Sequence, residues 1–501
     1  MAVCLHVDMT QKKIQTVDVP RRYEKTAGRA FVANFCVEKI DPFCYPLGEK
    51  NKLIITPGLL SQTDFPFAGR ITIGAKSPLT QGVAAANGGG RTAGELAKNG
   101  IKAVIIEGLP AQDKLYILEI NGLAARLVEA ENLRGKGVGE TVTILKQKYG
   151  KEAAITCIGP AGEMLPPTAA IANLDENGHA SCFCGRGGLG AVMGAKRIKA
   201  VVVTGSQPRP ERPNKPMEKL ERFLCAKLNA PSETSLLTRM SYSLGKTTPH
   251  NASILIKPGT VQAFKTYCQI ADSRQHMLLN SLINELGLDT LETAAAIGIF
   301  MEAEIIPWGD GEAAYALVKE VKEGSSLGLL LAQGSRAAAE ALGLEQNPHF
   351  KQIYPDYILK NKRPTPESLN DNFCAAQVFA SEHIGALKQH LRPPLEAEGE
   401  FYAVLNCLLD SLGLSLYTGP VFLQENAAWD NLLEAINYLY GWNLQKEELI
   451  NLSSQALRAE LKFNTLAGYT GRQNYLGGQY TEQRFYRQNG EAIHNNLFPQ
   501  I

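Results

Sequence analysis

The 501-residue sequence lacks a long apolar run, a charge imbalance and a regular cysteine pattern. No apolar stretch reaches the roughly 18 residues typical of a membrane-spanning helix. Met1 to Thr10 lacks the charged-then-apolar order of a signal peptide. Lys and Arg number 51 and Asp and Glu number 50, so no bulk charge attracts nucleic acid or an anionic membrane. We therefore expect a cytoplasmic protein with neither kind of partner.

The ten cysteines are scattered and include no C-x-x-C motif. A chain of this length without an export signal is not typical of a disulfide framework. Cys182 and Cys184 form the only close pair, and a C-x-C pair can chelate a soft metal if further ligands come from elsewhere. We expect most of the cysteines to be reduced, buried and small apolar side chains.

What is present indicates an α+β protein of about three domains, or of one large and one small domain. Hydrophobic residues make up 45% of the chain and charged residues 20%, as in ordinary globular proteins. Short β-branched runs punctuated by glycine predict a mixed α/β domain over residues 1–205. Four prolines in residues 206–216 predict a linker. The rest reads as mostly helical, in a first lobe over 217–395 and a second over 396–501, the break lying near the LEAEGE segment.

The individual elements follow from the same patterns. Strands are predicted at Val3–Val7, Leu53–Thr56, Ile71–Gly74, Ala103–Glu107, Leu115–Ile120, Ala154–Ile158 and Ala200–Thr204. Helices are predicted at Thr92–Lys98, Val138–Tyr149, Met217–Leu228, Met277–Leu286, Thr290–Ala303, Gly311–Lys322, Gly334–Leu342, Phe401–Leu412 and Asn431–Leu439.

An internal repeat supports the division into two helical lobes. Leu279–Asp289 reads LNSLINELGLD and Leu405–Ser415 reads LNCLLDSLGLS, with six of eleven positions identical. Each segment predicts a helix that ends at a glycine, because glycine adopts the left-handed conformation after a helix without steric cost. Any leucine-rich helix with a glycine cap would share part of this pattern, so chance similarity is the alternative.

Two glycine-rich loops are the strongest candidate binding features. Asn87-Gly88-Gly89-Gly90 stands directly before a predicted helix, where backbone N–H groups and the helix dipole attract anions. Arg70 and Lys76 could add contacts to phosphate, Arg as a bidentate donor and Lys as a point charge. A tight turn packed between strand and helix is the alternative for the glycines.

The second loop, Gly185 to Gly190, matches the G-x-G-x-x-G pattern of dinucleotide-binding proteins. Its context does not, because Asp175–Ser181 is turn-like where a strand should stand. The acidic residue nearest the required spacing, Glu211, lies in the proline-rich linker. A dinucleotide-dependent dehydrogenase therefore remains only a second alternative.

The order of motifs resembles the aldehyde ferredoxin oxidoreductase family of tungsten-pterin enzymes. The resemblance covers residues 1–205 and is carried there by Lys52–Ile55, Gly69-Arg70, Lys76–Thr80, Ala86–Gly89, Ile158–Glu163 and Arg186–Lys196. In the helical part it is carried by Trp308–Gly311, by the repeat and by the stretch around Leu457–Tyr475.

The resemblance implies a tungsten, or molybdenum, bis-pyranopterin cofactor, with the metal held by pterin sulfurs rather than by protein side chains. It implies a base domain under the cofactor, one repeat loop for each pterin, and oxidation of an aldehyde to a carboxylic acid. Carried over by motif, the cofactor-binding residues are Arg70, Lys76, Asn87, Gly88, Gly89, Arg186, Gly187, Asn284, Leu288, Asp289, Asp410, Leu414 and Ser415.

The sequence departs from the family at the ligands of the iron–sulfur cluster, through which electrons leave in family members. Family members bind a [4Fe–4S] cluster through a C-x-x-C-x-x-x-C run and a cysteine that ends the second repeat. No such run occurs here, and the last repeat position is Ser415, whose hydroxyl is a poor iron ligand. The first repeat has Asn284 where the family has Asp, and Cys182 stands where the family often has Arg. The resemblance also implies an active-site Glu and His; His383 and His390 are candidates without a matching motif, and the catalytic residues stay unassigned.

Two functions follow from these patterns. The first is a pterin oxidoreductase that passes electrons to an electron-transfer protein or iron–sulfur subunit. The second is a non-catalytic pterin-binding homologue that acts as a subunit or cofactor carrier. Metal content separates them, and the sequence leaves the substrate and the oligomeric state open.

Overall fold

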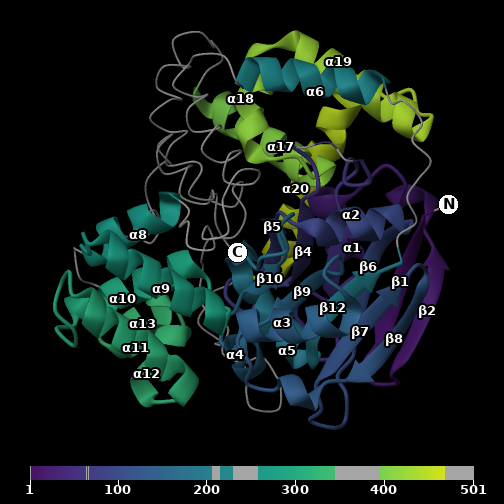
Figure 1. Ribbon diagram of the computed structural model, residues 1–501. Coiled ribbons are helices and arrows are strands. Elements are labelled where there is room, and N and C mark those ends of the chain that lie inside the picture. Colours follow the sequence, from purple (N-terminus) through teal and green to yellow (C-terminus); the bar gives the residue numbers. More distant parts are fainter. Residues whose placement is uncertain are drawn as a thin grey trace, which may run out of the picture.

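The structure, a computed structural model, describes residues 2–63, 65, 67–205, 215–228, 258–344 and 395–468. Two β-sheets with short helices form the N-terminal part, and the remaining described residues are helical (Figure 1). The α+β fold class predicted from the sequence is therefore confirmed.

The first sheet consists of β1 (Val3–Asp8), β2 (Lys13–Asp18), β3 (Leu53–Pro57), β4 (Ile71–Lys76), β5 (Val83–Gly88) and β6 (Ile101–Glu107). Their spatial order is β2-β1-β6-β3-β4-β5. Strands β1 and β6 run parallel, and all other neighbours are antiparallel. β3 and β4 are buried at every position, which explains their continuous apolar, β-branched sequences.

The second sheet repeats this arrangement. It consists of β7 (Tyr116–Asn121), β8 (Ala124–Glu129), β9 (Ala154–Ile158), β10 (Ile171–Asn173), β11 (Cys182–Cys184) and β12 (Ile198–Thr204). The order is β8-β7-β12-β9-β10-β11, and only β7 and β12 run parallel. Each strand thus corresponds to the strand six places earlier, so the N-terminal domain is an internal duplication.

The last strand of each half carries the clearest sequence trace of this duplication. Ile101–Val104 and Ile198–Val201 both read IKAV. The two lysines make similar hydrogen bonds. Lys102 Nζ donates to the Glu24 carbonyl at 2.7 Å, and Lys199 Nζ donates to the Lys136 carbonyl at 2.8 Å. Each lysine ties down the loop before a twelve-residue helix, α1 (Gly28–Lys39) or α3 (Val138–Tyr149).

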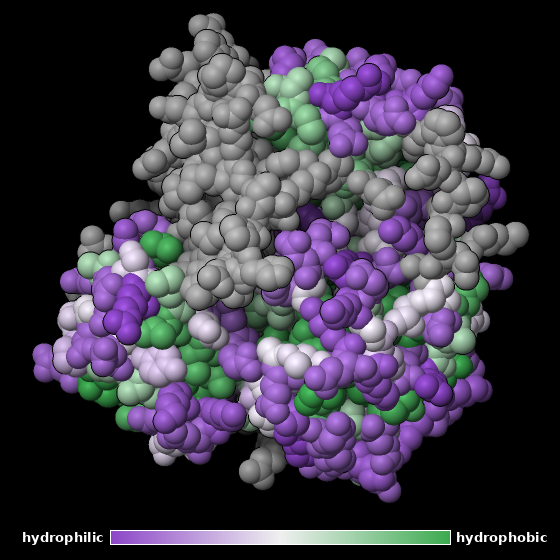
Figure 2. Space-filling model, viewed as in Figure 1, coloured by the Kyte–Doolittle hydropathy of each residue, from purple (hydrophilic) through white to green (hydrophobic). Residues whose placement is uncertain are grey.

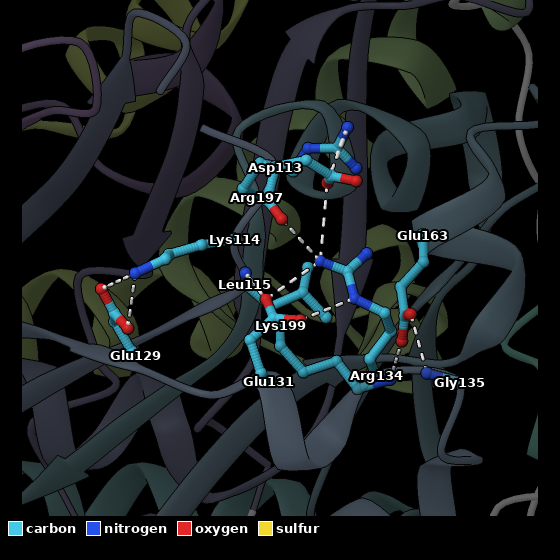
Figure 3. Close-up of polar contacts among 10 residues, drawn as sticks. All are labelled: Asp113, Lys114, Leu115, Glu129, Glu131, Arg134, Gly135, Glu163, Arg197 and Lys199. Carbon is cyan, nitrogen blue, oxygen red and sulfur yellow. Dashed lines mark hydrogen bonds and ion pairs between the residues drawn. The ribbon is translucent and has the colours of Figure 1, made fainter. Parts of the chain in front are cut away.

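A polar network fixes the loop that leads into α3 (Figure 3). Lys199 is fully buried and pairs with Glu163 at 2.5 Å, while the other oxygen of Glu163 accepts from the Gly135 N–H at 2.8 Å. Arg134 donates to Glu131 and to the Asp113 carbonyl, at 2.8 and 2.9 Å. The start of α3 is therefore held from both sides.

The two sheets share one apolar core, in which α5 (Leu189–Ala195) is buried between them. The other helices of this domain are α2 (Arg91–Lys98) and α4 (Pro160–Met164), with 3₁₀ turns at Arg21–Tyr23, Glu131–Leu133 and Arg186–Gly188. The side chains of Leu189, Val192 and Met193 in α5 join the core. This packing brings the glycine loop before α5 against the first sheet.

The first helical lobe comprises α8 (Pro258–Cys268), α9 (Ser273–Leu286), α10 (Thr290–Glu302), α11 (Gly311–Glu323), α12 (Ser326–Ala332) and α13 (Ser335–Ala341). α10 lies at its centre, and its small and apolar residues are buried on all sides. Side-chain caps fix several helix starts, as at Asp310, which accepts from the Glu312 and Ala313 N–H groups.

The second lobe comprises α17 (Leu395–Leu412), α18 (Gly419–Gln424), α19 (Asn426–Tyr440) and α20 (Lys446–Leu466). The LEAEGE segment predicted as a boundary forms the start of α17. Helix α6 (Lys215–Leu228) includes the last two residues of the predicted linker. The sequence assigned α6 to the first lobe, whereas its apolar side chains pack in the core of the second, beside α19 (Figure 1). The lobe boundaries themselves stay predictions.

Polar side chains cover most of the described surface in view, with apolar side chains scattered among them (Figure 2). Among the described residues, no helix is both long and apolar enough to cross a bilayer.

Candidate functional site

The two repeat segments form the same structure. α9 and α17 end at Gly287 and Gly413, whose φ angles are both +74°. The next residue in each loop donates back into its helix, Leu288 to Ile283 at 3.0 Å and Leu414 to Leu409 at 2.9 Å. Both are Schellman-type helix ends, which require glycine at the left-handed position. The similarity of the two sequences therefore reflects a structural repeat.

Each repeat loop docks on one half of the N-terminal domain through equivalent backbone bonds. The Gly287 carbonyl accepts from the Ala170 N–H at 2.8 Å, and Asp289 N–H donates to the Thr168 carbonyl at 2.8 Å.

The second loop repeats this pattern. The Gly413 carbonyl accepts from the Arg70 N–H at 3.2 Å, and Ser415 N–H donates to the Phe67 carbonyl at 2.8 Å. The duplicated base thus presents two equivalent edges to two equivalent loops.

Glycines allow this close approach. A Cβ on Gly159, at the end of β9, would overlap the backbone of Leu286, and one on Gly58, at the end of β3, would overlap Gly413. Neither position has the φ angle that by itself favours glycine, so the requirement is steric.

Between the two loops, β5 and β11 meet at a floor rich in glycine. A Cβ on Gly88 would lie 2.7 Å from Cys184 Sγ, and one on Gly89 would lie 3.4 Å from Cys182 Sγ. A Cβ on Gly185 would lie 3.4 Å from Asp289 Cγ. The predicted residues Gly88 and Gly89 therefore lie together with the C-x-C pair and the first repeat loop.

Two arginines lie beside this floor. Arg70 donates from Nε to the Asn87 side chain and from Nη2 to its carbonyl, the latter at 3.1 Å. Asn87 in turn donates to Thr72 Oγ1 at 3.1 Å, so Arg70 is held against β5. Arg186 Nε lies 3.9 Å from Asp289 Oδ2, too far for a hydrogen bond but close enough for attraction.

The two loops each bring one buried carboxylate to this site. Asp289 is 6% exposed and Asp410 8%. Asp289 caps α10, since its Oδ1 accepts from Leu291 N–H at 3.0 Å. Among the described residues, nothing donates a hydrogen bond to the buried atoms Asp289 Oδ2 and Asp410 Oδ1. A buried carboxylate oxygen without a donor is costly, so both atoms fit a ligand that carries N–H groups.

Burial raises the pKa of two carboxyl groups at this site, those of Asp410 and Glu292. Burial raises the pKa of Asp410 from 3.8 to about 6, against the lowering influence of Arg29 and Arg70, and Glu460 adds to the rise. One turn into α10, burial also raises the pKa of Glu292, whose Oε1 accepts from Ser335 N–H and Oγ at 2.9 and 2.6 Å. Burial therefore favours the protonated form of Asp410 and Glu292 relative to an exposed carboxyl group.

Three residues assigned to the cofactor from the sequence make contacts within the protein. Lys76 is 1% exposed, and its Nζ donates to the carbonyls of Pro42 and Cys44 at 2.6 and 2.8 Å, which tethers that loop, and its phosphate contact stays a prediction. Gly187 packs against Ala84 of β5, and its carbonyl accepts from Ser77 Oγ. Asn284 is half-buried, and its carbonyl caps the helix end.

The dinucleotide alternative finds no support in the geometry. Strand β11 before the second glycine loop has three residues and runs antiparallel to β10, while α5 has seven residues. A dinucleotide site requires a parallel strand–loop–helix unit. The candidate histidines His383 and His390 lie outside the described residues, as do residues 469–475 of the last matched stretch.

Sequence reasoning missed three side chains that support the loops. Glu285 accepts from the Gly139 N–H at the start of α3, and Ser411 accepts from the Ala30 N–H in α1, at 2.9 and 3.0 Å. Both occupy the seventh position of the repeat, so the alignment of the repeats could have found them. Arg29, which contacts Glu460 and faces Asp410, has no such signal.

Comparison with known proteins identifies the class. Residues 4–205 match the model for "Aldehyde ferredoxin oxidoreductase, N-terminal domain", and residues 246–497 match that for "Aldehyde ferredoxin oxidoreductase, domains 2 & 3". The chain belongs to the aldehyde ferredoxin oxidoreductase family.

Two curated relatives and one solved structure extend this result. The tungsten-containing aldehyde ferredoxin oxidoreductase of Pyrococcus furiosus is 26% identical, over 91% of this chain and 87% of its own length. The aliphatic sulfonate oxidoreductase, WOR-like subunit, of the same organism is 25% identical, over 89% and 83%. The active site complex BamBC of benzoyl coenzyme A reductase shares the fold, with a TM-score of 0.71 at 19% identity, over 96% of this chain and 92% of that chain.

The buried carboxyl group of Asp410 predicts a pH-dependent stability of the cofactor-free protein. Its pKa is about 6 when folded and near 3.8 when unfolded, so the folded state binds the proton more tightly. Asp410 therefore does not lower the free energy of unfolding below about pH 4. Above that pH the free energy of unfolding falls as pH rises, by up to about 3 kcal/mol above about pH 6. In urea unfolding at about pH 5 and about pH 8, Asp410→Asn should remove this loss of stability. A wild-type stability that rises with pH over this range, or an unchanged slope in the variant, would contradict the assignment.

Proposed function

We propose that the protein is an oxidoreductase that binds a tungsten, or molybdenum, bis-pyranopterin between its two repeat loops and the glycine floor. It would oxidise an aldehyde or oxo group and pass the electrons to a partner protein. The observation that carries this proposal is the pair of orphaned carboxylate oxygens, Asp289 Oδ2 and Asp410 Oδ1, presented by two equivalent loops. Two equivalent half-sites suit a cofactor made of two similar halves.

The residues present fit such a group. Asp289 and Asp410 would accept hydrogen bonds from pterin N–H groups, which would satisfy both buried oxygens. Gly88 and Gly89 let the Cys184 and Cys182 sulfurs of β11 lie close to β5, and Arg70 and Arg186 would attract anionic groups. When bound, the cofactor supplies the two-electron redox chemistry, and the protein supplies position and electrostatics. Glu292 lies beside Asp289 and Arg186, and burial raises the pKa of its carboxyl group.

Electrons released at the cofactor would need a partner protein to accept them, because the sequence lacks the family's cluster ligands. The sequence contains no C-x-x-C-x-x-x-C run, and Ser415 ends the second repeat where the family's cluster cysteine stands. A relative named as a WOR-like subunit matches over most of this chain, which favours a role within a multi-subunit enzyme. An iron–sulfur subunit or a separate electron-transfer protein would then accept the electrons.

Elemental analysis of anaerobically purified protein tests the proposal. We expect about one tungsten or molybdenum per chain, two pterins per metal and negligible iron, since four sulfurs of two pterins would hold one soft metal. Zinc-loaded or empty protein without pterin would contradict cofactor binding. Stoichiometric iron would contradict the loss of the cluster. Pterin without metal or turnover on any aldehyde would favour the non-catalytic carrier.

A further inference from the structure

Helix α20 reaches the predicted site from the far end of the described chain. Its residue Asn464 accepts a hydrogen bond from the Val83 N–H at 2.8 Å, at the start of β5. One turn earlier, Glu460 is 6% exposed and receives two hydrogen bonds from Arg29, from Nε and Nη2, both at 2.8 Å. α20 is thus bonded to the strand that carries Asn87 and Gly88, and to helix α1.

The Arg29 guanidinium links α20 to the second repeat loop. Its Nη1 lies 3.9 Å from Asp410 Oδ2, the oxygen opposite the orphaned Oδ1. The side chains of Arg29, Asp410 and Glu460 are 17%, 12% and 8% exposed. Because the bidentate contact with Glu460 fixes the guanidinium plane, the cation attracts one carboxylate oxygen and leaves the other available.

The first half-site lacks this arrangement at the equivalent positions. Glu285 and Ser411 share one repeat position, and each accepts a hydrogen bond from the first turn of a helix, Glu285 from the Gly139 N–H of α3 and Ser411 from the Ala30 N–H of α1. Gly139, the second residue of α3, corresponds to Arg29, the second residue of α1. Asn284 corresponds to Asp410. At these equivalent positions the carboxylate and its cation therefore occur together in one half of the duplicated site and are both missing from the other, whose own carboxylate, Asp289, faces Arg186 from a different repeat position.

We infer that Arg29 and Glu460 are positioning residues for the second cofactor half-site, and that they couple cofactor retention there to the docking of α20. The inference rests on the proposed function, since it assumes that the orphaned oxygen of Asp410 binds the cofactor. Arg29 holds the carboxylate in its ionised, accepting form, and Glu460 holds Arg29. Asn284 needs no such support because its amide carries no charge.

The charges that face Asp410 define the sign of the effect. Arg29 from α1 and Arg70 from the loop before β4 favour the ionised form, while Glu460 from α20 disfavours it, and Cys407 lies one turn earlier on α17. Removing Glu460 alone should therefore ease ionisation of Asp410 but leave the guanidinium less well held. Removing both partners should hinder ionisation, because the nearer cation is lost.

Two variants and one control test the inference. Glu460→Gln keeps the shape of the side chain, and the double variant Arg29→Met with Glu460→Met replaces the pair by apolar side chains of similar size, which a core often tolerates. Glu434→Gln, in the exposed pair with Lys219, is the matched control. Pterin and metal content after extended dialysis are measured for the purified proteins. Infrared titration of the carboxyl group is measured in cofactor-free protein, with Asp410→Asn used to assign the band.

We expect the double variant to lose pterin about 10- to 100-fold faster than wild type, and Glu460→Gln to lose it about tenfold faster. The Asp410 titration should move to lower pH in Glu460→Gln and to higher pH in the double variant. The control should change neither readout.

Full retention together with an unmoved titration in both variants would overturn the inference and leave the pair as a structural tie. Wild-type protein that holds no pterin would instead refute the proposed function, while the titration would still report whether Arg29 and Glu460 set the ionisation of Asp410.

Discussion

Asp410→Ala should lower the pterin content of the purified protein to a tenth of wild type or less. Hydrogen bonds to a charged, desolvated acceptor contribute about 1.5–3 kcal/mol, which corresponds to about tenfold or more in retention. Asp410 Oδ1 is buried and accepts no hydrogen bond from the part of the chain that the structure describes, so a bound pterin would supply a donor that is missing there. Pterin content per chain after gel filtration is the measurement.

Asp289 provides the matched comparison. Arg186 lies 3.9 Å from Oδ2, the oxygen of Asp289 that would accept from the cofactor, whereas Arg29 faces the other oxygen of Asp410, so we expect Asp289→Asn to reduce pterin content less than Asp410→Asn. Asn also keeps the cap on α10, because its side-chain oxygen can accept from the Leu291 N–H. Equal retention in the two variants would contradict the placement of the two half-sites.

Gly58→Ala and Gly159→Ala should each destabilise the protein by about 1–3 kcal/mol or more, because the added methyl group overlaps a repeat loop. The effects should fall on different lobes. Gly58→Ala should increase hydrogen exchange around residues 409–415, and Gly159→Ala around residues 283–289, since each glycine supports only its own loop.

Gly94→Ala in α2 is the control for these substitutions. A Cβ there would lie 3.5 Å from the Ser61 carbonyl oxygen, an ordinary contact. Alanine is favoured over glycine within a helix by about 0.5–1 kcal/mol, so this variant should be neutral or more stable. Uniform destabilisation in all three variants, without local changes in exchange, would argue against separate docking points.

The sequence predicted the buried strands and the regular helices, and missed elements whose patterns are weak. β9 and α3 have the predicted bounds, because a fully apolar run and a glycine-bounded periodic segment are strong signals. β2 and β8 are exposed edge strands with the polar sequences KIQTVD and AARLVE. α1 begins at a glycine with no side-chain cap and contains β-branched and aromatic residues that disfavour helix, so packing against β4 and α20 determines it.

For the candidate site too, local motifs in the sequence were informative, whereas contacts between distant segments could not be predicted. Motifs close in sequence brought Arg70, Asn87, Gly88 and Gly89 together correctly beside the second glycine loop, whose Arg186 faces Asp289. Charge alone does not decide the role of Lys76, because a lysine can be buried on backbone carbonyls as well as bind phosphate. Arg29 and Glu460 are 431 positions apart in the sequence, and no local pattern in either segment predicts their contact.

The position of α6 has a consequence for synthesis on the ribosome. Its apolar side chains pack mainly against α19, which begins at Asn426, long after α6 ends at Leu228. At 5–20 residues per second the intervening chain takes roughly 10–40 s to emerge. During that interval Met217, Leu220, Leu224 and Leu228 lack the helical part of their core, while Ala27, Leu59, Leu60, Phe65 and Phe67 of the same core have already been made. A nascent chain with such an unfinished face is a substrate for chaperones, and translation that pauses or stops before Asn426 would leave it prone to aggregate.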